Sequence, residues 1–144
     1  MTKIICKKIK MSQVWQNEKV IPVTVLKIEK DEEKAVDSLE EGQKVTLSGK
    51  SKGRGFQGVV KRHGFAGGPK SHGQKHSLRA PGSIGSTGPQ RVMPGKKMAG
   101  RMGNERVTIK NITIVQIKPE EKTILIKGAV PGMMGSTAEI RLNN

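Results

Sequence analysis

Acidic side chains, aromatic rings and cysteine are scarce in this chain of 144 residues. It holds 12 Asp and Glu against 27 Lys and Arg, with two Phe, one Trp, no Tyr and a single cysteine, Cys6. One thiol excludes an internal disulfide framework and favours a reducing compartment. So few aromatic rings also exclude the stacking platforms with which proteins read single-stranded nucleic acid.

Long apolar runs are absent as well. No stretch reaches the roughly 18 apolar residues of a membrane-spanning helix, and the opening MTKIICKKIKM lacks the apolar region of a signal peptide. A basic chain can bind an anionic membrane surface through an amphipathic helix, but the glycines and prolines of its basic segment argue against one. We therefore expect a soluble, cytoplasmic protein.

The positive charge is concentrated in residues 50–106. This segment holds 13 Lys and Arg, 13 Gly, four Pro, all three His and one acid, Glu105. Its formal net charge is +12, whereas the other 87 residues together carry +3. Its 13 apolar side chains are too few to offset the conformational entropy lost when 57 residues become ordered. We therefore expect a partner outside the chain to stabilise this segment.

A dense polyanion is the partner that this composition favours, because Lys and Arg bind phosphates and release counterions. We expect nucleic acid. The alternative is a solvated, charged linker, but a linker has no use for bulky side chains such as Phe56, Phe65, Ile84, Val92 and Met98. Zinc-finger spacing is absent, and we expect no recognition helix among the glycines. The class of nucleic-acid binder that remains is one with extended basic loops that enter folded RNA.

Short alternating or β-branched runs predict strands on both sides of the basic segment. The predicted strands are 2–15 as two short strands, 20–28, 43–48, 107–109 with 112–114, 122–127 and 137–142. The alternation changes phase around Lys110 and Asn111, as a bulge or turn would cause. Turns are predicted at 119–121 and 128–132. For the acidic stretch 29–41 a helical turn and a loop both stay open.

Strands at this spacing around a non-folding insert predict a mainly β protein. We expect a small antiparallel β-barrel with a long, basic, glycine-rich extended loop. The barrel body would comprise residues 1–49 and 107–144. Residues 50–106 would form the extension.

One motif suggests nucleotide binding. Residues 53–58 (GRGFQG) match G-x-G-x-x-G, which in dinucleotide-binding folds opens a helix that faces a pyrophosphate. We expect no helix through residues 59–69, no acid follows about 20 positions later, and no βαβ pattern surrounds the motif. We interpret the glycines as allowing close approach to phosphate, which Lys50, Lys52 and Arg54 would bind.

The three histidines suggest a metal site, because His72 and His76 are four residues apart. Zinc sites need three or four ligands that usually include thiolates or carboxylates, and neither lies near His63, His72 or His76 in the sequence. We expect no metal and no cofactor, and histidines that stack on bases or bind phosphates. The segment has no paired carboxylates and no nucleophile with its base, so we expect no catalytic site.

Several long motifs resemble a known family. They are KKIKMSQVW, VIPVTVLKI, KSKGRGFQGVVKRHGF, SHGQKHSLRAPGSIG, GKKMAGRMGNERVTI and KGAVPG. In this order, over nearly the whole chain, they closely resemble the bacterial form of the universal large-subunit ribosomal protein L three family. The resemblance implies a barrel of the translation-protein type and a structural, non-catalytic role in the large ribosomal subunit. It also implies direct binding to large-subunit (23S-type) rRNA early in assembly, with an extension directed towards the peptidyl transferase centre.

The resemblance places the rRNA-binding residues along the extension. They are Lys50, Lys52, Arg54, Lys61, Arg62, His63, Lys70, His72, Lys75, His76, Arg79, Arg91, Lys96, Lys97, Arg101 and Arg106. The tip of the extension comprises Gly82, Ser83, Ile84, Gly85, Ser86, Thr87, Gly88, Pro89 and Gln90. Further implied partners are neighbouring large-subunit ribosomal proteins, with no membrane and no small-molecule substrate.

The chain departs from the family pattern in two places. Between Ile28 and Gly42, members normally carry a substantially longer insert. At residues 86–90 the tip differs from the usual glutamine-containing sequence. The resemblance therefore does not assign the glutamine methylation known in some members, and Gln90 is a weak candidate for it. The alternative function is a free-standing nucleic-acid chaperone or regulator that uses the same basic segment. An enzyme that uses the G-x-G-x-x-G motif is a third hypothesis.

Overall fold

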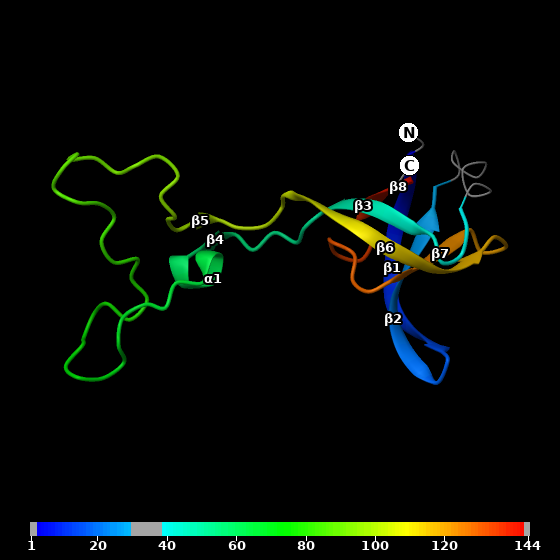
Figure 1. Cartoon of the computed structure of the whole chain (residues 1–144), viewed down its shortest axis with the longest axis horizontal. Helices are drawn as coiled ribbons and strands as arrows, with labels where there is room; N and C mark the ends of the chain where they lie inside the picture. The colour runs from blue at the N-terminus through cyan, green and yellow to red at the C-terminus, as the bar shows by residue number, and fades with distance from the viewer. Residues whose placement is uncertain (1–2, 30–38, 143–144) are drawn as a thin grey trace. The chain divides into compact units, whose positions relative to one another are not determined.

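The computed structural model describes residues 3–29 and 39–142, and the regular structure in them is mainly β (Figure 1). Its elements are β1 (Lys3–Gln16), β2 (Lys19–Ile28), β3 (Lys44–Lys50), β4 (Phe56–Gln57), α1 (Val59–His63), β5 (Gly100–Arg101), β6 (Arg106–Lys118), β7 (Thr123–Lys127) and β8 (Thr137–Leu142). The expected mainly β fold is confirmed. Most of the acidic stretch 29–41, with its choice between helical turn and loop, lies outside the described residues.

The chain divides into two compact units. We call residues 1–52 with 104–144 the body and residues 53–103 the basic unit. The body contains β1, β2, β3, β6, β7 and β8, whereas β4, α1 and β5 belong to the basic unit. The boundaries predicted from charge, 49/50 and 106/107, lie three residues from these junctions. Independent folding of the body stays a prediction.

The six strands of the body pair in a closed ring, in the order β1-β2-β7-β6-β3-β8. All neighbours are antiparallel, and β8 closes the ring because Ile140 pairs with Ile4 of β1 and with Leu47 of β3. Closure gives each body strand two neighbours, which satisfies its backbone groups over the paired stretches.

A β-bulge sets the register of β6 within this ring. Its pairing with β3 shifts by one residue between Ile109 and Ile112. Asn111, inside the shift, has a left-handed φ of 58°. The change of phase predicted around Lys110 and Asn111 is confirmed as a bulge, which turns alternate side chains back towards the interior. Two further shifts occur, one between β1 and β2 and one between β6 and β7.

Aliphatic side chains fill the interior of the ring. The largest fully buried ones are Ile4, Leu26, Leu47, Ile114, Ile124, Ile126 and Ile140. They come from all six strands. In β1 and β8 buried and more exposed residues alternate, whereas residues 123–126 of β7 are all buried. Each such burial contributes about 1.5–3 kcal/mol. The predicted strands on both sides of the basic segment therefore form one common core.

Strand β1 corrects one expectation. Residues 2–15 predict two short strands, but residues 3–16 form one. Ile4, Cys6 and Lys8 alternate inwards, and Lys8 is only 7% exposed. A lysine at an inward position, followed by the shift in register, interrupts the apolar pattern although the strand continues. The later residues of β1 pair with β2 alone.

Lys8 also fastens the connection between β7 and β8. Its Nζ donates hydrogen bonds to the carbonyl oxygens of Val130 at 2.7 Å and Gly132 at 3.1 Å. Its backbone N–H donates to Ser136, and its carbonyl accepts from the N–H of Gly135. Burial is the main cause that lowers the pKa of Lys8. The connection is thus held to β1 by both the main chain and the side chain of one residue.

Helix α1 corrects a second expectation, that no helix forms through residues 59–69. The helix has five residues and ends where Gly64 adopts a left-handed φ of 74° and donates to the carbonyl of Val60. Glycine is the preferred residue for such an ending. Lys61 and Arg62 lie in the last turn, where their positive charges stabilise the negative end of the helix dipole. The glycine that excludes a long helix therefore permits a helix of one turn.

Candidate nucleic-acid interface

Exposed cations dominate the basic unit, which holds ten Lys and Arg and no Asp or Glu. The exposed members of the predicted rRNA-binding set are Lys50, Lys52, Arg54, Lys61, Lys70, His72, Lys75, His76, Arg79, Arg91, Lys96, Lys97, Arg101 and Arg106. Arg62 and His63 are half-buried. Because residues 53–103 contain no carboxylate, the unit cannot neutralise its own charge. It presents a surface suited to a polyanion.

A short ladder joins the outgoing and returning arms of the basic unit. β4 and β5 are antiparallel, with Phe56 opposite Arg101. Beside them, the N–H of Arg54 donates to the carbonyl of Met102 at 2.9 Å. These contacts hold two arms together that lie more than 40 residues apart in the sequence.

Arg62 and His63 reach from α1 to the returning arm. Arg62 Nη1 donates to the carbonyl oxygen of Met98 at 2.7 Å, and His63 Nε2 lies 3.0 Å from the same oxygen. Gly100 makes room for this contact, because a Cβ there would lie 2.7 Å from Arg62 Nη1. These two predicted rRNA-binding residues hold the arms in place. Direct binding by them stays a prediction.

Two glycines, Gly67 and Gly68, close the neck of loop 69–76. We use neck for the place where residues 67–68 meet residues 77–78. The N–H of Gly68 donates to the carbonyls of Ser77 and Leu78, at 3.2 and 3.0 Å. A Cβ on Gly67 would collide with the carbonyl oxygen of Leu78, so this close approach requires glycine. The loop presents the exposed side chains of Lys70, His72, Lys75 and His76. The neck therefore brings four of the predicted site residues into one short loop.

The predicted tip, residues 82–90, is exposed and is shaped by its own serines. Ser83 Oγ donates to the carbonyl of Gly85 at 2.8 Å, and Ser86 Oγ donates to that of Gly88 at 2.9 Å. Gln90 has a φ of 58°. Local hydrogen bonds of this kind define turns without a surrounding core.

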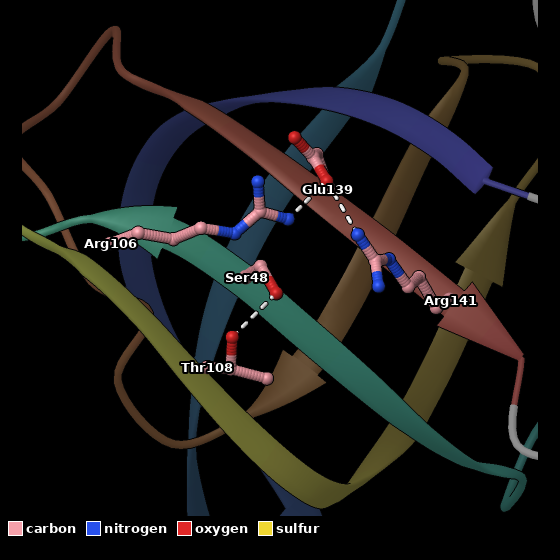
Figure 2. A network of polar contacts seen from close by, with 5 residues as sticks. All are labelled: Ser48, Arg106, Thr108, Glu139 and Arg141. Atoms are coloured by element: carbon pink, nitrogen blue, oxygen red, sulfur yellow. Dashed lines mark hydrogen bonds and ion pairs between the residues drawn. The ribbon is translucent and has the colours of Figure 1, made fainter.

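Where the extension leaves the body, Arg106 has an acidic partner. Arg106 Nη2 lies 2.6 Å from Glu139 Oε2, and Arg141 Nη2 lies 3.5 Å from the same oxygen. Figure 2 shows both arginines directed at this carboxylate. The hydrogen bond from Arg106 is the main cause that lowers the pKa of Glu139. Next to this pair, the hydroxyls of Ser48 and Thr108 lie 2.8 Å apart, between β3 and β6. Arg106 is thus partly neutralised, in contrast to the cations of the basic unit.

The predicted set omits three positions that shape this surface. Gly67 and Gly68 close the neck, and the carbonyl of Met98 fixes the helix against the returning arm. Adjacent glycines are a sequence signal for such close approach. A backbone carbonyl that accepts side-chain hydrogen bonds leaves no signal, because any residue can supply it.

The geometry does not favour the alternative sites. The G-x-G-x-x-G motif contains the two-residue strand β4 and precedes a helix of only five residues. Among residues 3–29 and 39–142, no three His, Cys, Asp or Glu lie together as a metal site would require. No helix in that part of the chain has the length and apolar character to cross a bilayer.

Comparison with known proteins places this surface in a family. A model of the family Ribosomal protein L3 matches residues 15–124. Large ribosomal subunit protein uL3 of Chlorobium limicola is 52% identical over 107 residues, which cover 74% of this chain and 51% of that protein. The uL3 proteins of Thioalkalivibrio sulfidiphilus and Alkalilimnicola ehrlichii are 52% and 44% identical over 115 and 129 residues, covering 79% and 89% of this chain.

The matched stretches cover 54% and 59% of these two proteins. The chain therefore spans little more than half the length of the curated relatives it matches. The family model, in contrast, extends from β1 through the whole basic unit into β7. The match thus covers the whole acid-free unit and part of the ring of strands, and we conclude that the chain belongs to the ribosomal protein L3 family.

Proposed function

We propose that the chain is a structural constituent of the large ribosomal subunit that binds large-subunit rRNA directly. The observation that carries this proposal is the basic unit: ten Lys and Arg, no acid, and most of these cations exposed. Such a surface is costly for a protein alone, because like charges repel and few apolar groups are buried. It becomes favourable when RNA phosphates replace the solvent counterions.

Each part of the molecule has its own task in this proposal. The body is a barrel of the translation-protein type that contacts neighbouring ribosomal proteins. The extension, residues 50–106, enters folded rRNA towards the peptidyl transferase centre and nucleates assembly. The cations act as phosphate ligands, and no chemical step is assigned to them. We place the protein on cytoplasmic ribosomes.

The salt dependence of binding to a large-subunit rRNA fragment tests the electrostatic part. With roughly 6–10 phosphate contacts, the affinity should fall by about 10³ to 10⁵ between 50 and 200 mM salt. Replacing Lys96 and Lys97 by alanine should lower the slope of log K against log salt by about 1.5–2. The matched control replaces Lys7 and Lys27, an exposed pair on the body, and should change the slope less. Equal effects would contradict the assignment of binding to the extension.

Sedimentation separates this function from that of a free-standing nucleic-acid chaperone. A structural constituent should remain with large subunits after a high-salt wash, because many contacts are buried within folded RNA. A chaperone that binds through exposed charge alone should be released by the salt.

A further inference from the structure

A pocket of the basic unit lies at the neck of loop 69–76. It is lined by Phe65, Gly67, Gly68, Ser77, Ala80 and Pro81. One aromatic ring, one proline ring and glycine backbone form its walls, and no charged side chain lines it. An apolar pocket within a unit of formal charge +10 is unexpected, because the surrounding sequence is rich in cations.

The walls of this pocket are held in place by hydrogen bonds. The N–H of Gly68 bonds to both Ser77 and Leu78, and the N–H of Ala80 donates to the carbonyl of Ser77 at 3.3 Å. The half-buried ring of Phe65 lies 6.1 Å from the ring of His63, measured between centroids, at a tilt of 46°. These contacts define the shape that the pocket has when the unit is ordered.

The charge next to the pocket indicates what it holds. Loop 69–76 carries Lys70 and Lys75, and Arg79 follows the neck; all three side chains are exposed. A ligand with a flat apolar part and adjoining negative groups satisfies both features. A nucleotide of RNA has this chemistry, whereas an apolar protein side chain would leave the cations without a partner.

We propose that this pocket takes one unpaired nucleobase of RNA, with the adjoining phosphates bound by loop 69–76 and Arg79. The inference rests on the proposed RNA binding and adds a base contact to it. The base stacks on Phe65, and the glycine backbone allows its edge to approach closely. One ring holds one base, which agrees with a chain too poor in aromatics to read a longer single strand.

A probe with and without bases tests this site in the full chain. The probes are an oligoadenylate of about eight nucleotides and a ribose-phosphate chain of the same length that lacks bases. At low salt, Phe65→Ala should weaken binding to the oligoadenylate about 5- to 10-fold, at the lower end of measured stacking effects. Binding to the abasic chain should change less than about 2-fold, because the phosphate contacts are unchanged.

Phe56→Ala is the matched control, because Phe56 is the other phenylalanine of the unit, is 76% exposed and lies outside the pocket. It should affect both probes equally. Gly68→Ala should weaken binding to both probes, because its Cβ would lie 2.7 Å from the carbonyl oxygen of Ser77 and part the neck that also positions loop 69–76. Dispersed amide signals of the body confirm that each variant is folded.

Several outcomes overturn the inference. Equal losses on both probes would show that Phe65 acts only through the fold of the unit, and no loss on either would show that no base enters. A selective loss for Phe56→Ala as large as that for Phe65→Ala would assign stacking to exposed rings in general. If the unaltered chain binds neither probe but still binds the large-subunit rRNA fragment in a salt-dependent manner, this inference fails alone. If it does not bind that fragment either, the proposed rRNA binding fails as well.

Discussion

Replacing Gly132 by alanine should destabilise the body by about 3 kcal/mol, because three costs coincide there. Gly132 has a φ of 98°, a conformation that strains a residue with a Cβ by about 1 kcal/mol or more. The new Cβ would collide with Ser136 Oγ and lie 2.9 Å from the carbonyl oxygen of Lys50. Moving the serine hydroxyl would break its 2.7 Å hydrogen bond to the carbonyl of Met133, worth about 1 kcal/mol.

The carbonyl of Lys50 yields less readily than a side chain. Lys50 pairs with Arg106 at the end of β3, and the next N–H, that of Ser51, donates to the carbonyl of Glu105 at 2.9 Å. Displacing this backbone should add about 1 kcal/mol or more, as overpacking does elsewhere. The contact therefore couples the connection between β7 and β8 to the point where the extension leaves the body.

Urea unfolding followed by far-ultraviolet circular dichroism measures this cost. Gly135→Ala is the control, because Gly135 lies in the same connection with a φ of 80° but has open space around its Cβ position. It should cost about 1 kcal/mol, the conformational part alone. The midpoints should differ accordingly at a similar m-value. Equal costs for the two variants would refute the steric reasoning and leave only backbone strain.

Three further predictions concern the body. Ile126→Ala, at a fully buried position of β7, should cost about 2–5 kcal/mol in urea unfolding, whereas Ile5→Ala, at a 37% exposed position, should cost far less; similar costs would contradict the described core. The pKa of Glu139 is lowered in the folded protein, so its stabilising effect should be complete above the ordinary value of about 4.3 and lost as pH falls through the folded pKa. Glu139→Gln should flatten this part of a stability curve measured from pH 6 to 3, and an unchanged curve would show that the pair with Arg106 contributes nothing. Replacing residues 53–103 by a short Gly-Ser linker should leave dispersed amide signals, because loop length changes closure entropy by only about 0.6 kcal/mol per doubling; an unfolded product would make the basic unit part of the core.

The strands of the body were largely predictable from alternation and from runs of β-branched residues. The runs at 20–28, 43–48, 122–127 and 137–142 correspond to β2, β3, β7 and β8, because each directs one set of β-branched or leucine side chains to the core. The failure in β1 has a specific cause, since the pattern treats Lys8 as a surface residue. Its ammonium is instead buried against two carbonyls of a connection more than 120 residues away in sequence. No local pattern contains that information.

Charge predicted which segment holds the candidate site. It did not predict the contacts that give this segment its shape. Lys and Arg counts located the basic unit, because electrostatics depends on composition over a segment. The one-turn helix, the neck at Gly68 and the acceptor at Met98 depend on which backbone groups meet between distant arms. Sequence periodicity indicates only which residues of one helix or strand share a buried face. It cannot identify the partner across a loop.

The pairing of β1 with β8 has a consequence for the order of events during synthesis. The first and last described strands are neighbours, so the ring cannot close until the polypeptide has been made as far as β8. Pairing between such distant segments slows folding, to milliseconds or longer in comparable all-β domains. The basic unit precedes β8 in the chain and is therefore complete before the ring closes. A nascent chain can thus meet a polyanion through its cations while its apolar core is still open.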